Sequence, residues 1–193
     1  MIFDKEKGDV LQEYDAHSFE IWYTSLSARD SNLIYTASDD SAFKCFDKRV
    51  PSMHVFANTK QHTAGVTFVK QMKELGEHAL VTGSYDCTVS VWDERKIGRQ
   101  PLESVETGGK SVWDIQVNKD NGLLGIASVY DGYLFARKDA DSENVVESLE
   151  FSQYEGHGSI CYAFEWIEGG ATSEGDGQSQ QLVLTSSFYD STL

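Results

Sequence analysis

A short pattern of residues recurs along this chain at an almost constant interval. Asp40 and Asp86 each lie in a polar turn between two apolar runs, 46 positions apart, and the preceding His17 and His62 lie 45 positions apart. A third turn aspartate, Asp131, follows Asp86 by 45 positions. Repeats of this length are single supersecondary units that cannot bury their apolar faces alone. The interval therefore predicts similar units stacked side by side around a shared core.

The clearest unit contains the segment 82–95, TGSYDCTVSVWDER. Asp86 lies in a turn, and the residues from Thr88 to Trp92 alternate between polar and apolar side chains, as in a half-buried strand. The segment is therefore expected to form a β-hairpin. Together with His62, it resembles the WD40 repeat, in which a histidine, a serine or threonine, an aspartate and a tryptophan form a buried hydrogen-bonded network. The positions that this resemblance assigns to the network are His62, Ser84, Asp86 and Trp92.

The other units are incomplete copies of this one. Phe46 stands where the repeat would place tryptophan, and Gly108 stands where it would place histidine. We place the repeats at approximately 17–60, 62–107, 108–155 and 156–193, with a Gly-, Ser- and Gln-rich flexible loop at 168–181. Helical periodicity is confined to a brief run at 69–75. The sequence thus predicts an all-β fold, an incomplete WD40 β-propeller of about three blades plus part of a fourth.

Composition and charge narrow the class of protein. The net charge of −15 argues against nucleic-acid binding through a basic surface, whereas a basic protein partner remains compatible with it. No window approaches the length of an apolar membrane span, and the first residues lack the pattern of a secretory signal. We therefore expect a cytoplasmic protein without membrane insertion. The three cysteines, Cys45, Cys87 and Cys161, have no metal-ligand spacing and are expected to be small buried side chains.

A set of short motifs, taken in order, resembles the diphthine methyltransferase family, whose members are better described as diphthine methylesterases. The motifs are HSFEIW at 17–22, HTAGV at 62–66, TGSYD at 82–86, GGKSVW at 108–113, HGSICYAFEW at 157–166 and SSFYD at 186–190. The resemblance implies hydrolysis of the methyl ester of methylated diphthine on translation elongation factor 2, a step of diphthamide biosynthesis. Lys110 departs from the family's glycine-rich pattern, and the strand after SSFYD is absent, so the chain looks like a fragment of a propeller.

Ester hydrolysis requires a base that accepts a proton from water or a hydroxyl group. His17, Glu20 and His157 are the candidates that the sequence offers, because the two histidines open units whose hydrogen-bonded networks have lost a member. The alternative for both histidines is the blade-locking role predicted for His62. Glu20 has the alternative role of a capping acceptor.

Three tryptophans, Trp22, Trp113 and Trp166, recur near the start of their units. They are candidates for a substrate-binding surface that holds a cationic side chain through cation–π contact, and core packing is the alternative. The sequence has neither zinc-ligand spacing nor a phosphate-binding loop, so no metal and no cofactor is expected.

A second class of function fits the same fold. The sequence WDER at 92–95, echoed by FDKR at 46–49, resembles the Trp-Asp-x-Arg signature of WD40 substrate receptors of cullin ubiquitin ligases. Most propellers of this kind are binding platforms. A non-catalytic interaction scaffold, including such a receptor, is therefore the alternative to the esterase.

Overall fold

The fold is seen in a computed structural model, which describes residues 1–50, 53–98, 100–119, 122–137, 150–154, 156–167 and 182–187. Three four-stranded antiparallel sheets, each a meander of consecutive strands, form the body of the molecule. We call them blades 1, 2 and 3. Blade 1 consists of β3 (Ile21–Leu26), β4 (Leu33–Ser38), β5 (Phe43–Asp47) and β6 (His54–Asn58). Blade 2 consists of β7 (Val66–Gln71), β8 (Ala79–Ser84), β9 (Thr88–Asp93) and β10 (Glu103–Glu106). Blade 3 consists of β11 (Asp114–Val117), β12 (Leu124–Ser128), β13 (Gly132–Arg137) and β14 (Glu150–Tyr154).

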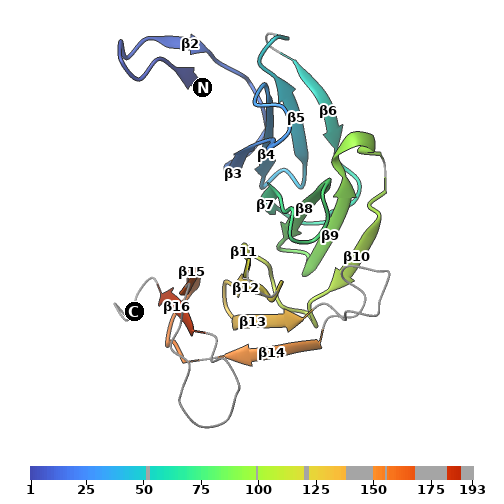
Figure 1. Ribbon diagram of the computed structural model, residues 1–193, viewed down its shortest axis with the longest axis vertical. Coiled ribbons are helices and arrows are strands. Elements are labelled where there is room, and N and C mark those ends of the chain that lie inside the picture. Colours follow the sequence, from blue (N-terminus) through green and yellow to red (C-terminus); the bar gives the residue numbers. More distant parts are fainter. Residues whose placement is uncertain are drawn as a thin grey trace.

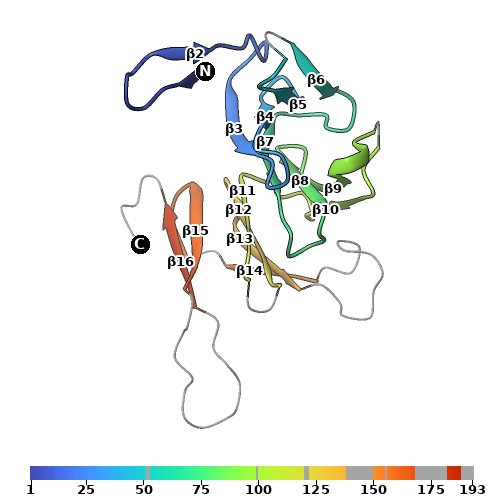
Figure 2. The same ribbon diagram turned by 45° about the horizontal axis from the view of Figure 1, so that its top comes forward.

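Two further strand pairs flank the blades. β1 (Ile2–Phe3) pairs with β2 (Val10–Gln12), and β15 (Cys161–Ile167) pairs with β16 (Leu182–Ser187). The blades follow one another in an arc that is open between the N-terminal pair and β15–β16 (Figures 1 and 2). The described chain is therefore an incomplete β-propeller, as the sequence predicts, with three blades and part of a fourth.

The first strand of each blade lies on the inner side of the arc, whereas β6, β10 and β14 lie on its outer side (Figure 1). These inner strands are neighbours: β3 contacts β7, and β11 contacts both β7 and β15. Because the inner strands are equivalent elements of successive blades, residues at matching positions on them gather at the same end of the arc. This arrangement brings together side chains that lie about 45 positions apart in the sequence.

Apolar side chains hold the blades face to face. One buried cluster joins blade 2 to blade 3 and includes Phe68, Val81, Ile115 and Ile126, each completely buried. Burying one such side chain contributes about 1.5–3 kcal/mol. A second cluster joins blades 1 and 2, and a third joins blade 3 to β15–β16. The core is thus distributed between the sheets, and each blade depends on its neighbours.

Two glycines allow this close packing. A Cβ atom on Gly83 of β8 would lie 2.5 Å from Val112 Cγ1, and one on Gly125 of β12 would lie 2.4 Å from the Phe164 ring. Both distances are too short for carbon atoms, so any side chain there would push the next unit away. The glycines therefore set the spacing between blades.

Helix is nearly absent from the described ranges. The only one there is a 3-10 turn at Glu94–Lys96, and the run at 69–75 that has helical periodicity begins inside β7. No described helix is long enough to cross a membrane. The cytoplasmic location remains a prediction. The predicted loop at 168–181 lies outside the described residues. All three cysteines are free thiols, with Cys45 and Cys161 buried and Cys87 partly buried in a turn.

Candidate functional site

A buried hydrogen-bonded network locks blade 2. His62 Nδ1 lies 3.1 Å from Asp86 Oδ2, His62 Nε2 lies 2.9 Å from Thr82 Oγ1, and Trp92 Nε1 donates to the same Thr82 oxygen at 3.0 Å. A carboxylate only accepts, so Nδ1 carries the proton that binds Asp86. Nε2 then accepts from the Thr82 hydroxyl, whose oxygen accepts from the indole. We call this arrangement the blade-locking network.

The prediction that Ser84 supplies the hydroxyl is wrong, because Thr82 does so. In the β8–β9 pair Trp92 lies opposite Leu80, so its indole reaches Thr82, the diagonal neighbour, and Ser84 is two residues further along the strand. Ser84 instead donates to the Ala64 and Gly65 carbonyls.

Asp86 is the electrostatic centre of the network. Burial alone would raise the pKa of this carboxyl group, but hydrogen bonds from His62, from the Thr88 hydroxyl and from the Thr63 amide lower the pKa to about 2. The carboxyl group is therefore ionised at neutral pH. Its side chain is only 7% exposed, and that of His62 only 1%.

Blade 1 repeats the network without its tryptophan. His17 Nδ1 lies 3.0 Å from Asp40 Oδ1, and His17 Nε2 lies 2.8 Å from Thr36 Oγ1. Phe46 occupies the tryptophan position and offers no donor. The His17 side chain is 0% exposed, and burial lowers its pKa although Asp40 acts in the opposite direction. The prediction that His17 is a catalytic base is therefore not supported, because both ring nitrogens are engaged and no solute reaches the ring.

His157 opens the β15–β16 unit in a similar way. Its Nε2 lies 2.8 Å from Thr185 Oγ1, the contact that His17 makes with Thr36 and His62 makes with Thr82. The Tyr133 and Tyr154 rings pack against the imidazole edge to face, with centroids 5.8 and 6.3 Å away. This placement corresponds to a blade-locking histidine. The sequence predicts that the network of this unit has lost a member, but its hydroxyl group is present on Thr185.

An aromatic cluster connects all four units at one end of the inner strands. The Trp113 ring contacts Trp22 of β3 at 5.3 Å, Tyr162 of β15 at 5.0 Å and Tyr85 of the β8–β9 turn at 5.9 Å between centroids. Trp22 is 41% exposed and Tyr162 is 37% exposed, so the cluster forms an accessible surface. Three rings from the other three units thus meet around Trp113.

A carboxylate lies at the edge of the aromatic cluster. Asp39 Oδ1 accepts from Trp22 Nε1 at 3.4 Å, and the Asp39 side chain packs on Gly65, where a Cβ atom would lie only 2.3 Å from Oδ1. Burial, together with Tyr130, Tyr162 and Asp39, raises the pKa of Tyr85 to about 12. The Tyr85 hydroxyl is therefore protonated at neutral pH. A carboxylate beside exposed aromatic faces is an arrangement that attracts cations.

Trp166 is not part of this cluster. It is 7% exposed and packs against Phe135 and Phe164, in the core between blade 3 and β15. Tyr162 occupies the position in the cluster that the sequence predicts for Trp166. Trp22 and Trp113 follow residues 17 and 108, which open their units, by five positions, and Tyr162 follows His157 by the same interval. The interval of five positions from the residue that opens each unit predicts Tyr162, whereas a search for recurring tryptophans selects Trp166.

Glu20, the third catalytic candidate, lies next to the carboxylate at this surface. It is exposed, and its carbonyl oxygen accepts from the Asp39 amide at 2.9 Å. The side chains of Glu20 and Asp39 therefore start from adjacent points of the backbone. Among the described residues, no group of three or more histidine, cysteine, aspartate or glutamate side chains is arranged to hold a metal.

Two arginines follow the third strands of blades 1 and 2. Arg95 donates through Nε and Nη2 to the two oxygens of Asp93, at 2.9 and 2.7 Å. Arg49 forms the same pair with Asp47 and also binds Asp30. Both guanidinium groups are at least half exposed. The two Asp-x-Arg turns thus present one geometry on consecutive blades.

Comparison with known families agrees with this architecture. The family described as WD domain, G-beta repeat matches residues 53–93, which contain most of blade 2. The matched repeat and the antiparallel blades together define the fold as an incomplete WD40 β-propeller.

Among such proteins, the chain is similar to diphthine methyltransferases. It is 29% identical to the Schizosaccharomyces pombe protein, in an alignment that covers 98% of this chain and 55% of the relative. It is 30% identical to the human protein, in an alignment that covers 81% of this chain and 34% of the relative. These relatives confirm the family resemblance inferred from the motifs. The chain spans about half the length of the first relative and a third of the second. It is also 35% identical to the DDB1- and CUL4-associated factor 11 homolog of Caenorhabditis briggsae, over 51% of its own length and 18% of the relative.

Proposed function

We propose that this chain is part of a propeller that acts in diphthamide biosynthesis, by hydrolysing the methyl ester of methylated diphthine on translation elongation factor 2. The observation that carries the proposal is the aromatic cluster around Trp113 with Asp39 at its edge, in a chain similar to diphthine methyltransferases. The substrate side chain carries a trimethylammonium group. Such a group binds to aromatic faces and is attracted by a neighbouring carboxylate.

In this proposal Trp22, Trp113 and Tyr162 hold the cationic group, and Asp39 balances its charge. Glu20 accepts a proton from water, the water oxygen attacks the ester carbonyl carbon, and the C–O bond to the methoxy group breaks. The methoxy group leaves as methanol after taking up a proton, and the carboxylate of diphthine remains. Glu20 has this role because it is exposed beside Asp39, whereas the His17 ring is buried.

The test uses the intact protein and elongation factor 2 that carries methylated diphthine, with loss of the methyl group followed by mass spectrometry. Replacing Glu20 by Gln should lower turnover about 100-fold or more if it is the base. The matched control is Glu13→Gln, an exposed glutamate in the segment after β2. Full activity of the Glu20 variant would remove Glu20 from the mechanism.

The aromatic cluster has its own test. Trp113→Ala should raise KM about tenfold or more, because cation–π contacts contribute about 1–2 kcal/mol when desolvated. The control Leu102→Ala removes an exposed apolar side chain from the segment before β10. An unchanged KM for the Trp113 variant would show that the substrate binds elsewhere.

A second candidate function is that of a substrate receptor for a cullin ubiquitin ligase. The two bidentate Asp-x-Arg turns support it, as does the similarity to a relative whose name refers to DDB1 and CUL4. If the intact protein has no esterase activity but captures a DDB1-type adaptor, and Arg95→Ala abolishes capture, this function replaces the first.

A further inference from the structure

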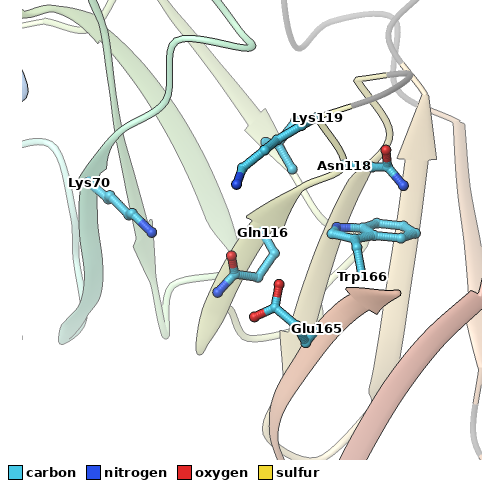
Figure 3. A pocket seen from close by; sticks show the side chains of 7 residues that line it. Lys70, Gln116, Asn118, Lys119, Glu165 and Trp166 are labelled. Atoms are coloured by element: carbon cyan, nitrogen blue, oxygen red, sulfur yellow. The ribbon is translucent and has the colours of Figure 1, made fainter. Parts of the chain in front are cut away.

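A polar cavity lies at the opposite end of the inner strands from the aromatic cluster. It has a volume of about 290 Å³ and is formed by β7, β11 with the residues that follow it, and β15. Its polar lining residues are Lys70, Gln116, Asn118, Lys119, Glu165 and Trp166 (Figure 3). Trp113 and Gln116 are three residues apart, so the cavity lies about 10 Å along the strand from the cluster. Three successive units build the cavity, which makes it a feature of the assembled blades.

A buried hydrogen-bond donor faces this cavity. Trp166 is 7% exposed, and no described residue accepts a hydrogen bond from its Nε1 atom. In Figure 3 the nitrogen edge of the indole is turned toward the space bounded by Gln116 and Lys119. Buried indole N–H groups normally have an acceptor. This N–H group is therefore available to an oxygen atom of a ligand in the cavity.

Charges of both signs surround the same space. The Lys70 side chain extends from β7 toward Gln116, and the Glu165 carboxylate faces Gln116 from β15 (Figure 3). Gln116 donates through Nε2 to Asp114 at 3.3 Å. Burial raises the pKa of Asp114, and the hydrogen bond that this carboxyl group accepts from Gln116 acts in the opposite direction. The cavity thus combines the ammonium groups of Lys70 and Lys119 with the carboxylate of Glu165.

We propose that this cavity binds a zwitterionic amino acid. The ligand carboxylate accepts from Trp166 Nε1 and pairs with Lys70, and the ligand ammonium group pairs with Glu165. A dianion such as phosphate is disfavoured, because Glu165 repels it. An apolar ligand would leave the indole donor without a partner. The site is separate from the aromatic cluster and does not depend on the proposed esterase.

The indole N–H of Trp166 is a direct reporter of binding. In ¹H–¹⁵N spectra of the intact protein its signal is assigned as the one lost in Trp166→Phe, a change that keeps the ring packing. Titration with L-serine should shift this signal in a saturable manner, whereas methylamine and inorganic phosphate at equal concentrations should not. Acetate, which supplies only the carboxylate, should bind about tenfold more weakly than L-serine. A Trp166 signal that L-serine leaves unchanged, or that phosphate shifts at lower concentration, would overturn the proposal.

Variants separate a binding site from a general effect on the fold. Glu165→Gln and Lys70→Met should each weaken L-serine binding about tenfold, measured by calorimetry, and Trp166→Phe should do the same. The matched control is Lys73→Met, an exposed lysine just beyond β7, which should leave the affinity unchanged. Equal affinities for the Lys70 and Lys73 variants, with both proteins folded, would contradict the assignment. Esterase activity is not used as a readout, so failure here leaves the proposed function untouched.

Discussion

Blades 1 and 2 have the same strand register but different blade-locking networks. In both, a histidine joins a turn aspartate to a threonine on the second strand, and the residue on the third strand lies at the equivalent position, Phe46 opposite Ile34 and Trp92 opposite Leu80. Only Trp92 adds an indole donor. The histidine and aspartate therefore persist without the tryptophan, which indicates that they are the part of the network that fixes the turn.

Blade 3 extends this comparison. Gly108 stands at the histidine position, and the blade is held by completely buried apolar residues such as Ile115, Ile126 and Tyr133. Its turn still contains an aspartate, Asp131, whose carboxylate accepts from the Ser128 hydroxyl at 3.3 Å. A blade can therefore form by packing between its neighbours, and the network adds local rigidity to blades 1 and 2.

The largest expected effect comes from removing the turn aspartate. Asp86→Ala leaves His62 Nδ1, the Thr63 amide and the Thr88 amide without their acceptor, and should lower the free energy of unfolding by about 3 kcal/mol. Asp40→Ala should cost about 2 kcal/mol, because the carboxylate is more exposed. Denaturant unfolding of the intact protein measures both. A larger loss for Asp40 than for Asp86 would reverse the ranking of the two networks.

Acid should weaken the two blades over different ranges of pH. The folded pKa of Asp86, about 2, lies below its unfolded value of about 4, so its stabilising effect is present above pH 4 and is lost as the pH falls toward 2. His17 has a lowered pKa, so the folded state loses stability as soon as the pH falls below the unfolded value of about 6.5. Blade 1 should therefore weaken in milder acid than blade 2.

The measurement is the free energy of unfolding between pH 7 and pH 2 for three proteins: the natural sequence and two variants. Asp86→Asn should flatten the decrease between pH 4 and 2, and His17→Gln should flatten the decrease just below pH 6.5. Curves for the two variants that run parallel to that of the natural sequence over the whole range would show that neither group is linked to folding.

Most members of the blade-locking networks of blades 1 and 2 can be predicted from the sequence. Donor and acceptor types at a constant interval identified His62, Asp86 and Trp92, and the matching interval identified His17 and Asp40. The hydroxyl partner was misassigned because strand register, which places Trp92 diagonal to Thr82, is not visible in a single hairpin sequence.

The two ends of the inner strands were harder to predict. The surroundings of Asp39 and of the Trp166 N–H group are formed by residues of other units. Asp39 packs on Gly65, and Trp166 lines the same cavity as Gln116. Such contacts follow from how blades stack. The spacing of residues within one repeat does not contain this information.

Exchanging the residues at the tryptophan position is the sharpest test of the difference between the blades. Phe46→Trp should stabilise the protein by about 1 kcal/mol, because the indole would donate to Thr36 and extend into a cavity of about 360 Å³ that Thr36 and Phe46 line. Trp92→Phe should cost about 1–2 kcal/mol by removing the donor to Thr82. Destabilisation by both changes would mean that blade 1 has no room for the complete network.

The smallest expected effect concerns the residue after each turn aspartate. Ser41 and Cys87 adopt positive φ angles of 61° and 67°, a conformation that side chains disfavour, whereas the corresponding position of blade 3 is Gly132, with φ 83°. Cys87→Gly should stabilise the protein by about 0.5 kcal/mol, since relief of left-handed strain slightly exceeds the entropy that glycine adds to the unfolded chain. Gly132→Ala should cost about 1 kcal/mol. Thermal unfolding of both variants measures the two changes in stability. If Cys87→Gly lowers the stability, the weak contact of the Cys87 thiol with the Tyr85 carbonyl outweighs the backbone strain.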